Sequence, residues 1–275
     1  MPNNKDATSS PFKRILNVGR TGAGKSTQLW TLPGKKFLYA FDPNTLSALE
    51  QRDKRGNRIR LDIEYETFLP DVLEVDATLK GFNKGSKDDK MFDKSKREPT
   101  AYMRFVEDIN KRVDDGYFND FNWICFDSFT FISKATMARQ LFINERYGGI
   151  EELGDYRVVG SKISEVFSSI SALPINIYAT GHINVFQDEK TKKLETMLNL
   201  PGSAKNMIPL VFTDVWQAET GEDKNGALEY QLRTKPDPRG LKEIRSSVPL
   251  KEIEVITIQD FGNPEQYGIG ALLQR

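Results

Sequence analysis

The sequence has 275 residues, of which 38% are hydrophobic and 28% are charged, and this composition favours a folded domain over a disordered chain. Its 39 basic and 39 acidic residues give a formal net charge of zero, so any affinity for nucleic acid has to come from a local basic patch. The single cysteine, Cys125, excludes a disulfide framework, and no apolar stretch approaches membrane-spanning length. Because the start has no signal-peptide core, we expect a cytoplasmic protein without a membrane partner.

The phosphate-binding loop is the clearest motif. Residues 1–11 are polar and are expected to form a flexible tail, and residues 12–18 predict a strand that leads into GRTGAGKST, a complete G-x-x-x-x-G-K-[ST] pattern. A helix is expected behind it, from Ser26 to Leu32. The residues expected to contact ATP are Gly19, Arg20, Thr21, Gly22, Ala23, Gly24, Lys25, Ser26 and Thr27. Lys25 would reach the β- and γ-phosphates, and the Ser26 hydroxyl would ligate Mg²⁺.

Two further apolar runs end on carboxylates. Residues 122–127 (NWICFD) read as a strand buried on both faces, so Asp127 is expected to support Mg²⁺ at the strand terminus, although it could instead cap the next helix. Ser128 follows it where many ATPases carry a glutamate base, so a base would have to come from another strand. Asp42, at the end of KFLYAFD, is the candidate, the alternative being a simple turn residue before Pro43.

The remaining elements alternate. Helical spacing predicts helices over 102–113, 128–146 and 159–170, and the next buried strand, 174–180, leads to His182. His182 is the only histidine and could either sense the γ-phosphate or cap its strand. A hairpin or a long loop with a charged tip is expected over 185–200, followed by three later strands. This order predicts a mostly parallel, doubly wound α/β sheet with antiparallel C-terminal strands.

One core domain, residues 12–260, accounts for these elements, and residues 261–275 are expected to form a C-terminal tail. Within the core, residues 51–60 are expected to form a charged surface turn. A polar insertion at about 80–99 predicts either a solvated surface loop or a basic contact for a nucleic-acid backbone.

The succession of phosphate loop, strand with a carboxylate tip, Asp127-Ser128 and a Thr-Gly-His strand resembles the RecA-like P-loop ATPases. More closely, it resembles the phage-encoded Sak-type nucleotide-binding proteins, compact single-strand annealing proteins. The segments LPGSAKNMIPLVFTDVW (200–216) and LRTKPDPRGLKEIR (232–245) are similar to that group's C-terminal half. The usual catalytic glutamate of the family is replaced by Asp42, which is one methylene shorter.

The resemblance implies ATP and Mg²⁺ as cofactors, with Lys25, Asp42, Asp127 and His182 as catalytic residues. It also implies that the loop after His182 faces DNA, where the candidates for backbone contact are Lys190, Lys192 and Lys193. Phe186 could stack on a base or fill the hairpin core. A basic residue completing a neighbour's ATP site would be Arg233, Lys235 or Arg245.

These expectations favour a phage ATPase that is stimulated by DNA, binds single-stranded DNA and promotes strand annealing or exchange. It is expected to assemble as a homo-oligomeric filament or ring in the host cytoplasm. A single-strand-binding protein is a further expected partner, on the resemblance alone. Two alternatives stay open: a P-loop kinase of a small molecule, and a nucleotide-gated interaction protein with little turnover.

Overall fold

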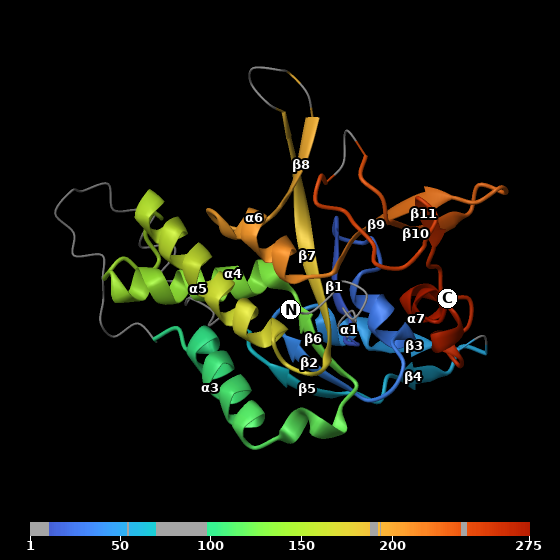
Figure 1. The fold of residues 1–275 in the computed structure, drawn as a ribbon, viewed down its shortest axis with the longest axis horizontal. Coiled ribbons are helices and arrows are strands. Elements are labelled where there is room, and N and C mark those ends of the chain that lie inside the picture. Colours follow the sequence, from blue (N-terminus) through green and yellow to red (C-terminus); the bar gives the residue numbers. More distant parts are fainter. Residues whose placement is uncertain (1–10, 54, 70–97, 188–191, 193, 238–240) are drawn as a thin grey trace, which may run out of the picture.

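The computed structural model describes residues 11–53, 55–69, 98–187, 192, 194–237 and 241–275 (Figure 1). Three expectations lie outside the described residues: the tail at residues 1–10, the polar insertion up to residue 97, and the DNA contacts of Lys190 and Lys193. Within the described residues, no helix is both long and apolar enough to pass through a lipid bilayer.

A nine-stranded sheet forms the centre of the molecule, in the order β11-β10-β9-β1-β7-β6-β2-β5, with β8 paired to the outer half of β7. Its strands are β1 (Arg14–Gly19), β2 (Lys36–Ala40), β5 (Glu64–Thr67), β6 (Trp123–Asp127), β7 (Asn176–Gln187), β8 (Leu194–Leu198), β9 (Asp214–Glu222), β10 (Leu228–Arg233) and β11 (Ile253–Val255). From β9 to β5 the neighbours are parallel, whereas β10, β11 and β8 pair antiparallel. The predicted fold class, a mostly parallel sheet with antiparallel C-terminal strands, is confirmed.

The central strands are buried on both faces because their side chains alternate between two apolar cores. In β1, Leu16 and Val18 belong to one core and Ile15 to the other. The first core lies under α3 (Ala101–Asp114), η2 (Tyr117–Asp120), α4 (Phe129–Ile143), α5 (Leu153–Ser171), α6 (Ala204–Met207) and η3 (Ile208–Val211). The second core lies under the 3₁₀ helix η1 (Ser26–Thr31) and α7 (Gly268–Leu273). Figure 1 shows α3, α4 and α5 on one side of the sheet and the C-terminal elements on the other.

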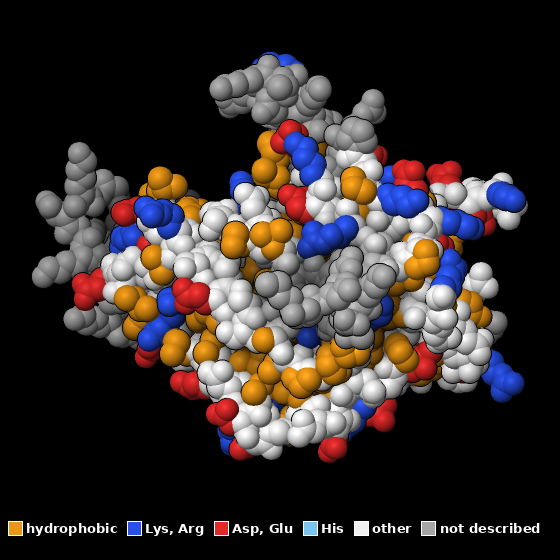
Figure 2. Space-filling model, in the orientation of Figure 1, with side chains coloured by type: hydrophobic (Ala, Val, Ile, Leu, Met, Phe, Trp, Pro, Cys, Tyr) orange, Lys and Arg blue, Asp and Glu red, His pale blue; other side chains and the backbone are white. Residues whose placement is uncertain are grey.

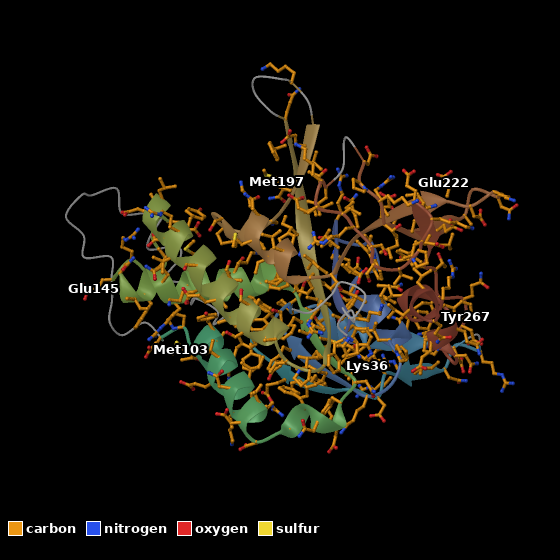
Figure 3. All side chains as sticks on the ribbon, in the orientation of Figure 1. Lys36, Met103, Glu145, Met197, Glu222 and Tyr267 are labelled. Carbon is orange, nitrogen blue, oxygen red and sulfur yellow. The ribbon has the colours of Figure 1, made fainter. Side chains whose placement is uncertain are left out.

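The strand order positions the site. The phosphate loop follows β1, Asp127 ends β6, and β7 lies between these two strands, so three carboxyl ends of parallel strands meet at one edge. The peptide bond between Asp127 and Ser128 is cis. Beyond this edge β7 continues and pairs with β8 to form an arm that projects from the body. Met197 lies on this arm, far in the view from Tyr267 at the start of α7 (Figure 3).

Two segments differ from the elements expected from the sequence. Residues 50–60, expected to contain a surface turn, form a two-stranded antiparallel ribbon of β3 (Glu50–Arg52) and β4 (Arg58–Arg60) after the short α1 (Thr45–Ala48). Residues 261–275, set apart as a tail, contain η4 (Pro264–Gln266) and α7, whose Ile269 and Leu272 are buried against η1.

Candidate nucleotide-binding site

The phosphate loop has the backbone that its glycines predict. Gly22 and Gly24 have φ of +82° and +78°, in the left-handed region that side chains disfavour. Gly19 has no room for a side chain, because a Cβ there would lie 2.4 Å from the carbonyl oxygen of Ala218. Ser26 and Thr27 are half-buried at the start of η1. The loop therefore has the conformation needed to turn backbone amides toward an anion.

Lys25 is buried within this loop. Its Nζ donates hydrogen bonds to the carbonyl oxygens of Gly19, at 3.0 Å, and Arg20, at 2.8 Å. Burial lowers the pKa of the Lys25 ammonium to about 8, and the negative charges of Asp127 and Asp42 act in the opposite direction. An anionic phosphate brought next to this ammonium would stabilise its charged form, so the loop is electrostatically suited to a triphosphate.

Both carboxylate oxygens of Asp127 accept a hydrogen bond from a threonine hydroxyl. Thr45 Oγ1 donates to Oδ2 at 2.7 Å, and Thr180 Oγ1 donates to Oδ1. The backbone oxygen of Asp127 also accepts from the amides of Phe41, at 2.7 Å, and Asp42, at 3.1 Å. This carboxylate, only 2% exposed, is consequently fixed in orientation and joined to the segment that carries Asp42.

Asp42 contributes to a turn and also faces the site. Its Oδ1 accepts hydrogen bonds from the backbone amide of Asn44, at 2.8 Å, and from the Asn44 side chain, at 3.2 Å. The half-buried carboxylate is nevertheless close enough to Lys25 and His182 for its charge to oppose the lowering of their pKa values by burial. The contact with Asn44 fits the turn role, and the position fits the role of base, which stays a prediction.

His182 ends the buried part of β7, and its backbone amide donates to Thr130 Oγ1 at 3.1 Å. Burial, and then the charge of Lys25, lowers the pKa of the imidazole, so it is neutral near pH 7. Its Nδ1 is buried and has no hydrogen-bond partner in the described part of the chain. An unsatisfied buried nitrogen calls for a partner, and a bound phosphate or water would supply one.

A cleft of about 760 Å³ begins at the phosphate loop and runs along the arm. Its walls include Arg20, Phe131, Lys134, His182, Asn184 and Phe186. The ammonium of Lys134 lies 4.6 Å above the ring of Phe131. The cleft thus combines cations, amides and aromatic rings, which are the groups that hold a phosphodiester chain and its bases.

The phosphate loop is also fixed from the neighbouring strand and from behind. The hydroxyl of Tyr178 on β7 donates to the carbonyl oxygen of Lys25 at 2.8 Å and accepts from the Asn17 side chain. Behind the loop, the amide of Gly270 in α7 donates to Thr31 Oγ1 at 3.1 Å, and a Cβ on Gly270 would lie 1.8 Å from the backbone oxygen of Thr31. This close approach makes α7 a support for η1.

Of the side chains expected to contact DNA, the structure describes Lys192 and Phe186, and their roles stay predictions. Lys192 is exposed, with a φ of +57°, and its carbonyl oxygen accepts a hydrogen bond from Gln187. Phe186 is 36% exposed at the wall of the cleft rather than buried in a hairpin core. It is therefore free to stack on a base.

Two of the three candidates for action on a neighbour's site are held within the chain. Arg233 pairs with Glu219 at 3.1 Å, with Glu252 at 3.0 Å and with Asp237 at 3.6 Å. Figure 2 shows acidic and basic side chains intermixed at this β9–β10–β11 end of the molecule.

The guanidinium of Arg245 donates to the backbone oxygens of Pro209 and Phe212. Lys235 is the exposed member of the trio. The role of each of the three in trans stays a prediction.

The sequence patterns do not indicate three hydroxyls of the site: those of Thr45 and Thr180, which donate to Asp127, and that of Tyr178, which donates to the phosphate loop. Thr180 belongs to the Thr-Gly-His run, which was noticed for its histidine. Thr45 follows Asp42 by three residues, in a segment with no motif. Only the strand order, which places β2 and β7 on either side of β6, brings both threonines to Asp127.

The chain is an α/β protein whose mostly parallel sheet carries a G-x-x-x-x-G-K-[ST] loop directly after β1. No protein-family model and no curated protein matches the sequence. Among solved structures it is similar to a KaiC-like protein from the hyperthermophilic archaeon Pyrococcus horikoshii, with 12% identity and a TM-score of 0.43, over 92% of this chain and 88% of that one. At this identity and TM-score, the similarity carries neither fold nor function.

Proposed function

We propose that this protein binds and hydrolyses ATP with Mg²⁺ and couples that cycle to single-stranded DNA, as an annealing protein of the phage Sak type. The observation that carries the proposal is the meeting of Lys25, Asp127 and His182 at one edge of the parallel sheet, with an open cleft beside them. A lysine ammonium in the loop and a fixed carboxylate on a neighbouring strand are groups that P-loop proteins use to hold phosphates and Mg²⁺ for phosphoryl transfer.

The ATP half of the proposal assigns a task to each residue. Amides of the loop and Lys25 would hold the phosphates, while Ser26 and Asp127 would hold Mg²⁺, which supplies charge neutralisation when bound. Asp42 would accept a proton from the attacking water. The unpartnered Nδ1 of His182 would contact the γ-phosphate or its water and transmit the presence of that group to the arm that follows it.

The DNA half rests on the cleft. Arg20 and Lys134 would contact phosphates, and Phe131 and Phe186 would stack on bases without reading the sequence. Because His182 forms part of the same wall, occupancy of the ATP site and of the cleft would influence each other. Assembly as a homo-oligomer in the host cytoplasm, and cooperation with a single-strand-binding protein, belong to the proposal through the Sak resemblance.

The test is ATP turnover measured with and without single-stranded DNA, together with DNA binding measured with and without ATP. Wild type should show each ligand strengthening the effect of the other. Lys134→Ala should weaken DNA stimulation while leaving basal turnover intact, because Lys134 is exposed in the cleft. Turnover indifferent to DNA, together with DNA binding indifferent to ATP, refutes the coupling.

The two alternatives predict different results in the same assay. A small-molecule kinase would turn over ATP in response to an acceptor molecule, with DNA inert. A nucleotide-gated interaction protein would be stabilised by ATP without releasing phosphate. Measuring phosphate release beside thermal stabilisation separates all three.

A further inference from the structure

The ribbon of β3 and β4 presents arginines on one face. In its register Glu50 is opposite Arg60, and Arg52 is opposite Arg58. Because side chains alternate along a strand, these four share a face, whereas Gln51 and Ile59 share the other. Arg58 and Arg60 are highly exposed, with 69% and 75% of their side-chain surface accessible. We call residues 50–60 the arginine ribbon.

Asp53 accepts hydrogen bonds from two residues that follow it, Arg55 and Asn57. Its Oδ1 accepts from the amides of Arg55 and Asn57, both at 2.8 Å, and its Oδ2 accepts from the Asn57 side chain at 2.9 Å. These hydrogen bonds, that of the Asn57 side chain first, lower the pKa of Asp53. Gly56, with a φ of +83°, completes the turn. The carboxylate of Asp53 is thus occupied by hydrogen bonds within the turn, and the ribbon is a platform that carries the arginines.

The charge on this platform is unbalanced. Arg52, Arg55, Arg58 and Arg60 are all exposed, and Glu50 is the one carboxylate that pairs with them in the described structure, at 2.5 Å to Arg60 and 3.9 Å to Arg58. The chain as a whole is neutral, so this is a local concentration of positive charge.

We propose that the arginine ribbon binds the phosphodiester backbone of single-stranded DNA, at a place separate from the cleft. Arg58 and Arg60 are two residues apart on one strand, a separation of about 7 Å along it. Each guanidinium group can donate two hydrogen bonds to one phosphate, so the pair can bind two phosphates in a row. This inference rests on the DNA-binding part of the proposed function.

A nucleic-acid backbone fits the ribbon better than an acidic protein surface does. Protein interfaces have an apolar centre, whereas none of the described residues of the ribbon exposes a large apolar side chain. A hollow of about 370 Å³ beside Arg52 and Arg58 leaves room for a sugar. It is lined also by Leu46, Ser47, Gln51 and Glu50, the carboxylate that pairs with Arg58 and Arg60.

The residues of the arginine ribbon are not among those that line the cleft, and the ribbon lies away from the arm that forms part of the cleft. In Figure 1, β3 and β4 are at the lower right and the arm of β7 and β8 is at the top. Figure 2 shows a basic side chain protruding at the edge where the ribbon lies. Two separated backbone sites would let one molecule hold two strands, or two stretches of one strand, which annealing requires.

The experiment measures the affinity of the full chain for a fluorescent oligo-dT across a salt series. The double variant Arg58→Ala/Arg60→Ala should flatten the log–log salt slope by about 1.4, since each contact with a single-strand phosphate contributes about 0.7. The matched control, Arg157→Ala/Lys162→Ala, removes the same charge from exposed positions on α5 and should leave the slope unchanged. Arg58→Lys/Arg60→Lys should keep most of the slope, which excludes a folding defect.

Each outcome decides the proposal. If the alanine variant has the salt slope of wild type, while wild type binds DNA and its ATP turnover responds to DNA, then the ribbon does not contact DNA. The proposed function is unaffected by that result. If wild type binds no DNA at any salt, the DNA part of the proposed function fails and the ribbon fails with it. If the alanine variant loses self-association without DNA while its slope is unchanged, the ribbon contacts a second copy of the chain, and a DNA role is refuted.

Discussion

The hydroxyl of Thr45 is the group whose removal tests the site most directly. Thr45→Val keeps the shape of the side chain but removes the donor to Asp127 Oδ2, a 2.7 Å hydrogen bond between groups 1% and 2% exposed. A buried hydrogen bond to a charged acceptor is worth about 1.5–3 kcal/mol, and the carboxylate left behind cannot recruit bulk water. We therefore expect the free energy of unfolding to fall by about 1.5–3 kcal/mol.

The assay is denaturant unfolding and thermal melting of the protein without nucleotide. For a chain of this size, 1 kcal/mol corresponds to roughly 2–4 °C, so the melting temperature should fall by about 3–12 °C. The control is Thr45→Ser, which keeps the hydroxyl and should recover most of the loss. In ATP turnover assays, Thr45→Val should need a higher Mg²⁺ concentration than Thr45→Ser. The reason is that a less constrained Asp127 carboxylate orients the metal less well.

Two results would refute this reasoning. If Thr45→Val lowers the free energy of unfolding by less than about 0.5 kcal/mol, the Thr45 hydroxyl does not hold the Asp127 carboxylate. If Thr45→Ser and Thr45→Val are equally destabilised, the loss of stability comes from packing and not from the hydrogen bond. Either result would remove Thr45 from the support of Asp127 and leave Thr180 as its donor.

Three further predictions concern the loop and its support. Lys25→Ala should abolish the stabilisation by ATP, which is about 2.7 kcal/mol at 100 times Kd for the native protein, and a melting shift retained in the variant would count against the loop. Because the pKa of Lys25 is lowered to about 8 and phosphate binding needs the charged form, ATP affinity measured by calorimetry should fall as pH rises above 8, approaching about tenfold per pH unit; a flat profile to pH 9.5 would contradict the pKa. Gly270→Ala should destabilise the protein by about 1–3 kcal/mol through its clash with Thr31, whereas Gly154→Ala, in open space on α5, should be neutral or stabilising in the same melts.

The sequence is most informative where the functional residues follow one another along the chain. The phosphate loop needs only successive residues, so its pattern alone identifies the segment in which Gly22 and Gly24 have a positive φ. Asp127 is predictable because an unbroken apolar run marks a strand covered on both faces. The order of helices and strands follows from the same periodicities, and so does the mostly parallel sheet.

The rest depends on contacts that local patterns do not encode. Thr45 and Thr180 reach Asp127 through the register of three strands, and a lone threonine carries no signal of that. The strands of the arginine ribbon are three residues long, too short for an alternating pattern to be distinguished from a charged turn. The docking of α7 depends on Gly270 meeting Thr31, 239 residues earlier in the chain.

That last contact has a consequence for how the pocket is made. The amide of Gly270 and the hydroxyl of Thr31 can meet only after the 239 residues that lead from Thr31 to Gly270 have been synthesised, since synthesis proceeds from the N-terminus at about 5–20 residues per second. The nascent phosphate loop therefore waits for its back support, and a chain interrupted before α7 carries the complete motif on an unsupported base. The back support of the phosphate loop would then form only when α7 has been synthesised and has docked on η1.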